Sequence, residues 1–242
     1  MARKPEVAGR TGRRARPPSR YKFPDPETGT GREGLIGVGA DFAPGTMLAA
    51  YHQGIFPWPA PDLDVVVWCS PDPRAIFPLE STEAPHWSRS LTRAMRKKPF
   101  RVTVDHAFAG VLEGCADRPE GTWITPDLTA GYVRLHEMGW AHSLEVWNTR
   151  SGALVGGIFG LALGAAFTAE SMFHRETDAS KVAFASLVER LRPTFRLFDV
   201  EVQSSHLASL GCVTIPRREF LRRLRLALEE QPEFPRDVGV PG

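Results

Sequence analysis

The sequence predicts an α+β protein that buries a sizeable hydrophobic core. Its second part alternates short segments of helical spacing with short apolar strands. Within that part, "HSLEVW", "ALVGGIFGLAL" and "AAFTAE" follow one another, with the turn signal "NTRSG" after the first, which is typical of an antiparallel meander. With 242 residues, 42% of them hydrophobic, the chain can form one large domain or a small and a medium one.

The N-terminal part begins with a segment that lacks an apolar period. Residues 1–32 are rich in Arg, Pro and Gly, and we expect them to form a disordered basic tail. The tail has no apolar stretch of the kind that a secretory signal needs. From Gly34 onward the sequence shows signals of regular secondary structure. Pro44 stands at the first position of a helix that Gly54 ends, and the loop "GIFPWPAPDLD" follows.

Caps and apolar spacing predict the elements of the second part. Ser88, Asp105 and Thr125 each stand where a helix would start, and Asp178 or Ser180 caps the fourth helix. The expected helices span residues 89–98, 106–115, 126–138, 181–192 and 217–230. The expected strands span residues 100–104, 142–147, 153–163, 165–170 and 195–203.

Composition and charge narrow the class of protein. Lys and Arg number 30 against 28 Asp and Glu, so the net charge of +2 argues neither for nor against a nucleic-acid partner. The longest apolar stretch, residues 153–169, is broken by glycines and too short to cross a bilayer, so no membrane span is expected. Three cysteines without close spacing fit reduced thiols in the cytoplasm. Seven histidines show no metal-ligand spacing, so no metal is expected.

Acidic residues beside buried strands predict a site for proton transfer. Glu170 follows the apolar run "ALVGGIFGLALGAAF", where a buried carboxylate without a partner costs roughly 3 kcal/mol or more. In "FRLFDVEVQ", Asp199, Glu201 and Gln203 share one strand face, which sets two carboxylates about 6 to 7 Å apart. Such a pair raises at least one carboxyl pKa, which suits proton transfer near neutral pH. The alternative is a charged, solvent-facing edge strand.

Several longer motifs together point to a known family. The strings "GIFPW", "WCSPDPRAIF", "GTWIT", "LHEMGWAHSLEVW", "LVGGIFG", "ESMFHRETDASKVA" and "HLASLGCVTIPRREFL" occur in this order within residues 34–224. With them the chain resembles the leucyl/phenylalanyl-tRNA-protein transferase family. The resemblance implies a small N-terminal α/β domain over residues 33–72 and a larger catalytic domain over residues 73–242. The larger domain is expected to be similar to the GCN5-related N-acyltransferase fold, with a mixed, largely antiparallel sheet flanked by helices.

The resemblance also implies a reaction. Leu or Phe, and less readily Met, moves from leucyl-tRNA or phenylalanyl-tRNA to the α-amine of a protein that begins with Arg or Lys. The product is marked for degradation in an N-degron pathway. Aminolysis of an ester needs positioning, a proton acceptor and charge stabilisation, so no cofactor is expected. We expect the protein to be a cytoplasmic monomer.

Two acids match the active centre of the family. We expect Asp199 to accept or relay the amine proton, and Glu170 to orient the cationic acceptor or the reacting ester. One departure concerns Glu201, because the family usually has Gln two residues after the Asp. The carboxylate takes over that role, Gln203 replaces it through a bulge, or the activity is weakened or altered. The sequence leaves these three outcomes open.

The resemblance assigns two further groups of residues, and a local excess of positive charge indicates a third. Trp58 and Trp123 are expected to hold the terminal adenosine of the tRNA by stacking, with Tyr51 close by. An apolar pocket for the transferred side chain is expected from Tyr132, Ile158, Phe167 and Met172. The basic helix offers Arg89, Arg93, Arg96 and Lys97 on one face to tRNA phosphates. The alternatives are ordinary core residues for the first two groups and a solvated face for the third.

Rival functions are a transferase that uses acyl-CoA, a hydrolase and a tRNA-binding module. The sequence has no R-x-x-G-x-G/A loop for a CoA pyrophosphate and no G-x-S-x-G elbow. A tRNA-binding module would bind leucyl-tRNA without transfer. The acidic pair Glu170 and Asp199 argues against that module, because a phosphate binder gains nothing from carboxylates beside its ligand.

Overall fold

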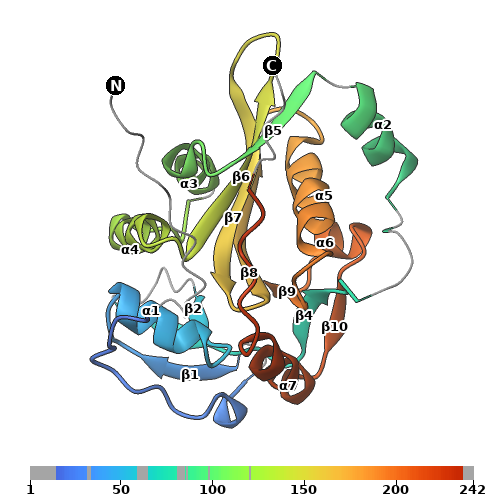
Figure 1. The fold of residues 1–242 in the computed structure, drawn as a ribbon. Helices are drawn as coiled ribbons and strands as arrows, with labels where there is room; N and C mark the ends of the chain where they lie inside the picture. Colours follow the sequence, from blue (N-terminus) through green and yellow to red (C-terminus); the bar gives the residue numbers. More distant parts are fainter. Residues whose placement is uncertain are drawn as a thin grey trace, which may run out of the picture.

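The computed structural model describes residues 15–31, 34–58, 65–80, 85, 87–97, 99–119 and 121–236. Its N-terminal part is a three-stranded antiparallel sheet in the order β1-β3-β2, covered by helix α1 (Figure 1). The strands are β1 (Leu35–Val38), β2 (Phe56–Trp58) and β3 (Val67–Cys69), and the helix is α1 (Pro44–Tyr51). Pro44 starts the helix as predicted, and Gly54, with φ +74°, lies in the turn into β2.

The second part is built on a seven-stranded sheet in the order β10-β4-β9-β8-β7-β6-β5. Its strands are β4 (Arg74–Phe77), β5 (Phe100–Val104), β6 (Ala141–Asn148), β7 (Leu154–Leu163), β8 (Ala166–His174), β9 (Leu197–Glu201) and β10 (Val213–Ile215). All neighbours pair antiparallel except β8 and β9. The predicted α+β class and the mixed, largely antiparallel sheet are therefore confirmed.

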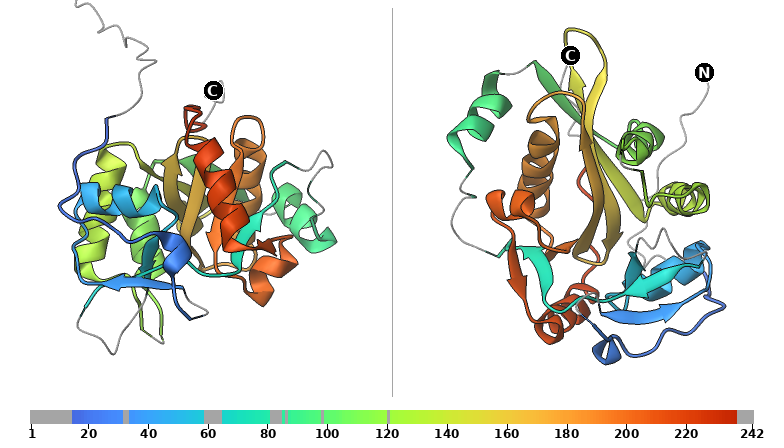
Figure 2. Two further views of the ribbon diagram at one scale, coloured as in Figure 1. Left: turned by 90° about the horizontal axis from the view of Figure 1, so that it is seen from below. Right: turned by 180° about the vertical axis from the view of Figure 1, so that it is seen from behind.

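Helices cover both faces of this sheet. They are α2 (Arg89–Lys97), α3 (Phe108–Ala116), α4 (Pro126–Glu137), α5 (Ala179–Leu191), α6 (Ser205–Ser209) and α7 (Arg217–Ala227). The two green helices α3 and α4 lie on one face, and the orange α5 lies on the other with α2 outside it (Figure 2). Helix α7 lies across one end of the sheet (Figure 1). Each face thus has its own hydrophobic core.

The two sheets share the core beneath α3 and α4. Met47 of α1 and Trp68 of β3 belong to the same buried cluster as Tyr132 of α4 and Phe159 of β7. The chain passes from one sheet to the other between β3 and β4. This shared core fixes the N-terminal sheet beside the ends of β8 and β9.

Part of the segment predicted to be a disordered tail packs against the protein. The ring of Phe23 lies 5.0 Å from that of Trp68, edge to face. Arg217 donates to the backbone carbonyls of Glu27 at 3.2 Å and Gly29 at 3.4 Å. The aromatic contact and the hydrogen bonds to these carbonyls stabilise the segment against the protein. The amino-acid composition of the segment does not reveal such contacts. The remaining residues of the predicted tail, 1–14 and 32, lie outside the described residues.

One of the predicted helix starts differs in the structure. Asp105 does not cap a helix, because its carboxylate accepts from the Ser143 backbone N–H at 2.9 Å and pairs with His142 Nδ1 at 2.7 Å. Helix α3 accordingly begins later, at Phe108. Thr125 caps α4 as predicted, accepting from the Leu128 N–H at 3.3 Å.

None of the described helices is long and apolar enough to span a membrane.

Candidate active site

The sheet opens between β8 and β9, and a pocket lies at the opening. The two parallel strands pair only where residues 166–168 meet residues 197–199. Beyond that point they separate, and residues 169–172 and 200–202 line a cavity of about 260 Å³. The complete lining is Phe56, Pro57, Trp58, Trp123, Ile158, Ala169, Glu170, Ser171, Met172, Phe184, Val200, Glu201, Val202 and Leu207. Parallel strands that part in this way offer side chains from both to one ligand.

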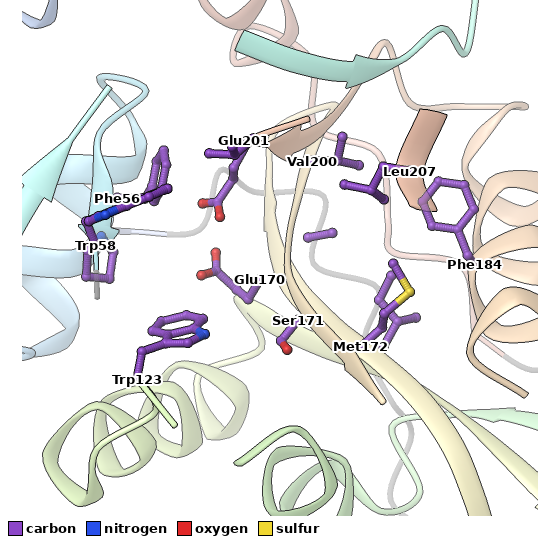
Figure 3. A pocket seen from close by; sticks show the side chains of 14 residues that line it. Phe56, Trp58, Trp123, Glu170, Ser171, Met172, Phe184, Val200, Glu201 and Leu207 are labelled. Atoms are coloured by element: carbon purple, nitrogen blue, oxygen red, sulfur yellow. The ribbon is translucent and has the colours of Figure 1, made fainter. Parts of the chain in front are cut away.

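Glu170 of β8 and Glu201 of β9 point toward each other across the cavity (Figure 3). Each side chain is about nine-tenths buried, with a residue exposure of 9%. The Oε1 atom of each is buried and has no hydrogen-bond partner among the described residues. Burial raises the pKa of Glu170 to about 7. Burial, followed by the charge of Glu170, raises the pKa of Glu201 well above its ordinary value.

A chain of tyrosine hydroxyls supports Glu170 from behind. The Tyr132 hydroxyl of α4 donates to Glu170 Oε2 at 2.5 Å, and the Tyr51 hydroxyl of α1 lies 2.9 Å from that of Tyr132. Burial raises the pKa of both tyrosines well above 10, so they remain neutral donors. We expected Tyr51 beside the adenosine and Tyr132 in the side-chain pocket. Neither lines the cavity. The Tyr132 hydroxyl contacts Glu170 from behind the cavity, and the Tyr51 hydroxyl contacts that of Tyr132.

Asp199 lies behind the cavity in a bidentate ion pair with Arg74. Its carboxylate accepts from Arg74 Nε at 2.8 Å and Nη2 at 2.6 Å, and from the Glu201 backbone N–H at 2.9 Å. Both side chains are 1 to 2% exposed. The guanidinium also lies 4.5 Å from the Phe56 ring centroid and 4.4 Å from that of Phe220. Asp199 does not line the cavity.

Arg74 is the charged residue of this site that sequence reasoning missed, and Phe56, Phe184 and Leu207 of the lining were not predicted either. Arg74 stands in "PRAIF", where the next three residues are apolar and buried. A cation in such a strand must pair with an acid, and this was the signal that could have identified it. Its partner, however, comes from β9, far away in the sequence.

The two acids predicted to share a strand face are separated by a turn of the backbone. Glu201 has φ +62° and ends β9, and the β4–β9 register shifts between Ala75 and Ile76. The Glu201 side chain therefore enters the cavity while Asp199 pairs with Arg74. Gln203 does not line the cavity and donates to the Cys212 carbonyl at 2.8 Å. Glu201, the residue at which the sequence departs from the expected pattern, therefore faces the cavity, and Gln203 does not.

The cavity has an aromatic side and an apolar side. Phe56, Trp58 and Trp123 stand near the two carboxylates, and both tryptophans are half-buried (Figure 3). The opposite side holds Met172, Phe184 and Leu207 (Figure 3), with Ile158 also in the lining.

Of the expected side-chain pocket, Ile158 and Met172 are in place. Phe167 is not in the lining, because its ring packs 5.9 Å from Phe198 in the core.

The predicted basic face lies on α2. Arg89, Arg93 and Arg96 are exposed, while Leu91 and Ala94 of the same helix are 1% and 3% exposed. The side chain of Lys97 lies outside the described residues. In the described part of the chain, no group of three or more His, Cys, Asp and Glu side chains could hold a metal ion.

Comparison with known proteins identifies relatives over most of the chain. The family model for leucyl/phenylalanyl-tRNA protein transferase matches residues 79–225, and the model for its N-terminal domain matches residues 40–72. A leucyl/phenylalanyl-tRNA--protein transferase from Citrobacter koseri is 50% identical over 206 residues, which cover 84% of this chain and 85% of that protein. One from Ruegeria pomeroyi is 52% identical over 193 residues, covering 79% of this chain and 89% of that protein.

Solved structures give only a distant likeness. A tandem GNAT protein from the clavulanic acid biosynthesis pathway is 14% identical, covering 74% of this chain and 60% of that chain, with a TM-score of 0.36. At that score the likeness decides neither fold nor function. The family models and the relatives at 50% identity are decisive: this chain belongs to the leucyl/phenylalanyl-tRNA protein transferase family.

Proposed function

We propose that this chain transfers Leu or Phe, and less readily Met, from aminoacyl-tRNA to the N-terminal α-amine of proteins that begin with Arg or Lys. Membership of the family supports the reaction. The observation that carries it is the position of the Glu170 carboxylate, which lies between an aromatic and an apolar side of one cavity.

Each side of the cavity fits one part of an aminoacyl-adenosine. The half-buried rings of Trp58 and Trp123 can stack on the adenine, which requires no sequence-specific hydrogen bonds. Ile158, Met172 and Leu207 offer apolar atoms to a Leu or Phe side chain. The flexible thioether of Met172 can adapt to either shape. The ester that joins the two parts then lies beside Glu170.

Glu170 is the group best placed to take a proton from the attacking amine. An α-amine has a solution pKa of about 7.7 to 8.0 and must lose a proton as it attacks the ester. A carboxylate whose pKa burial raises to about 7 is a far better base than an exposed one. The Tyr132 hydroxyl holds that carboxylate in position.

In our proposal Asp199 acts as a positioning residue. Its carboxylate already accepts two hydrogen bonds from Arg74 and one from the Glu201 N–H. It therefore fixes the backbone that directs Glu201 into the cavity. We therefore assign to Glu170 the role of proton acceptor that the sequence predicted for Asp199.

The acidic balance of the site suits a cationic acceptor. Among the described residues, Glu170, Asp199 and Glu201 all interact with the guanidinium of Arg74. The resulting negative field attracts an acceptor whose N-terminal residue carries a positive side chain. Acting as a cytoplasmic monomer, the enzyme would mark such acceptors for degradation.

The test is transfer of radiolabelled Leu from leucyl-tRNA to a peptide that begins with Arg. We expect transfer by the wild type, a loss of about 100-fold or more in Glu170→Gln, and no change in Glu113→Gln on the exposed side of α3. If the wild type binds leucyl-tRNA but transfers nothing, the proposal fails and a tRNA-binding module is favoured. If Glu170→Gln transfers at the wild-type rate, the assigned base is wrong.

A further inference from the structure

The carboxylates of Glu170 and Glu201 cannot both be ionised at low energetic cost. Both are nine-tenths buried, each has an Oε1 atom without a partner among the described residues, and they face each other (Figure 3). Arg74 attracts both, but its hydrogen bonds from Nε and Nη2 go to Asp199. Like charges in such a site share a proton between them.

The surroundings decide which of the two carries that proton. Glu170 accepts a hydrogen bond from Tyr132, which in turn contacts Tyr51, and this favours an ionised Glu170. Glu201 faces Glu170 from β8, Asp199 on its own strand and Arg74 from β4. The β2 residues on its other side, Phe56 and Trp58, carry no charge, and neither does Leu207 of α6. Glu201 therefore has the charges of Glu170 and Asp199 on one side of the balance and that of Arg74 on the other, but no side chain among the described residues donates a hydrogen bond to its Oε1.

We infer that Glu201 is a neutral carboxylic acid that donates a hydrogen bond to the carbonyl oxygen of the aminoacyl ester, while ionised Glu170 receives the proton of the attacking amine. This inference rests on the proposed function. A preorganised donor at the oxygen where negative charge develops stabilises the transition state, most strongly in a buried site. A carboxyl group can donate in this way only while it keeps its proton.

The step is balanced within the two substrates and Glu170. The amine nitrogen bonds to the ester carbonyl carbon, and its proton passes to the Glu170 carboxylate. The carbon–oxygen bond to the ribose then breaks, and the ribose oxygen takes the proton from Glu170. Glu201 keeps its proton throughout, so the site returns to its starting state after each transfer.

Infrared spectroscopy of the free enzyme tests the protonation state without any transfer reaction. At pH 8, above the pKa of about 7 to which burial raises the Glu170 carboxyl, we expect the carbonyl stretch of a neutral carboxylic acid in the wild type and in Glu113→Gln, and the loss of most of it in Glu201→Gln. A spectrum without that band, or a band that persists at full intensity in Glu201→Gln, overturns the inference. Because no substrate is present, this outcome is independent of whether the proposed function holds.

Single-turnover transfer over a range of pH tests the donor role. Glu201→Gln retains an uncharged donor of similar shape, so we expect a loss of no more than about tenfold at pH 7. Glu201→Met fills similar space without a donor and should lose about 100-fold or more. The wild-type rate should decline at alkaline pH as Glu201 ionises, and this decline should be absent in Glu201→Gln. Equal losses in the two variants, or an unchanged alkaline decline, would overturn the donor role.

Discussion

The guanidinium of Arg74 and the carboxylate of Asp199 form a buried bidentate ion pair, with Nε to Oδ1 at 2.8 Å and Nη2 to Oδ2 at 2.6 Å. The pair joins β4 to β9 at the point where the sheet opens. Arg74 also lies over the rings of Phe56 from the N-terminal sheet and Phe220 from α7. It therefore connects three parts of the fold that surround the cavity.

Arg74→Met should destabilise the protein by about 3 to 5 kcal/mol, because it leaves the buried Asp199 carboxylate without its cation. Urea denaturation at pH 7 measures the change. Arg222→Met is a matched control, since Arg222 forms a similar bidentate pair with Glu219 on the exposed side of α7 and should have little effect. A similar effect of both substitutions would show that burial does not set the strength of the Arg74 pair.

Glu170→Gln should make stability less dependent on pH. Folded Glu170 keeps its proton up to a pKa of about 7, whereas an unfolded Glu loses it near pH 4.3. The folded state therefore binds more protons between these values, and the contribution of Glu170 to stability falls as pH rises. At pH 8 the variant should be more stable than the wild type by up to about 3 kcal/mol, and near pH 4 this advantage should vanish.

Denaturation at pH 4, 6 and 8 measures this effect. Glu113→Gln, an exposed carboxylate on α3, should show the same stability difference from the wild type at each pH. If Glu170→Gln behaves like Glu113→Gln, burial does not raise the pKa of Glu170.

Local patterns in the sequence predicted much of the fold. The cap at Thr125 and the apolar spacing that follows it lead directly to α4, and alternating apolar runs lead to the β6, β7 and β8 meander. These elements depend on residues that are close together in the chain. The order β10-β4-β9, by contrast, places strands together that are far apart in sequence, so the partnership of Arg74 with Asp199 had no local signal.

The sequence predicted only part of the site, again because contacts between residues far apart in the chain leave no local signal. Glu170, Glu201, Trp58 and Trp123 were identified and do line one cavity. The helical spacing of Tyr132 indicates only a buried face, and it does not reveal that the hydroxyl finds a carboxylate on β8. The positive φ of Glu201 likewise follows from tertiary constraints that an alternating strand pattern does not contain.

Trp123→Ala should weaken the binding of an adenosine carrying an amide-linked Leu, a stable analogue of the aminoacyl end. The half-buried ring lines the cavity beside Glu170, so losing it removes about 1 to 3 kcal/mol of stacking. Calorimetry measures the dissociation constant. Trp123→Phe keeps an aromatic face and should recover most of the affinity. If Trp123→Ala binds as tightly as the wild type, adenine does not stack there.

The basic face of α2 should make tRNA binding depend on salt. If Arg89, Arg93 and Arg96 each contact a phosphate, replacing any one by Gln should reduce the slope of log affinity against log salt by about 0.9. Filter binding at several salt concentrations gives the slopes. Arg218→Gln and Arg225→Gln, exposed on α7, serve as controls of equal charge. Equal changes from both helices would indicate a diffuse electrostatic effect and argue against contacts by α2.

Met172→Ala should change the preference between the two transferred side chains. Met172 lines the apolar side of the cavity, and shortening it leaves room that phenylalanine fills better than leucine. Since one methylene contributes about 1 to 3 kcal/mol to discrimination, the ratio of kcat/KM for Phe over Leu should rise by about tenfold or more. Competition between leucyl-tRNA and phenylalanyl-tRNA measures this ratio directly.

Phe167→Leu separates selectivity from general loss of packing. Phe167 was expected in the same pocket, but its ring packs against Phe198 and Phe234 in the core. Its substitution should therefore lower the melting temperature and reduce both transfer rates without changing their ratio. A shift in the ratio as large as that of Met172→Ala would place Phe167 in contact with the substrate. It would mean that the cavity deepens toward the core when the aminoacyl group binds.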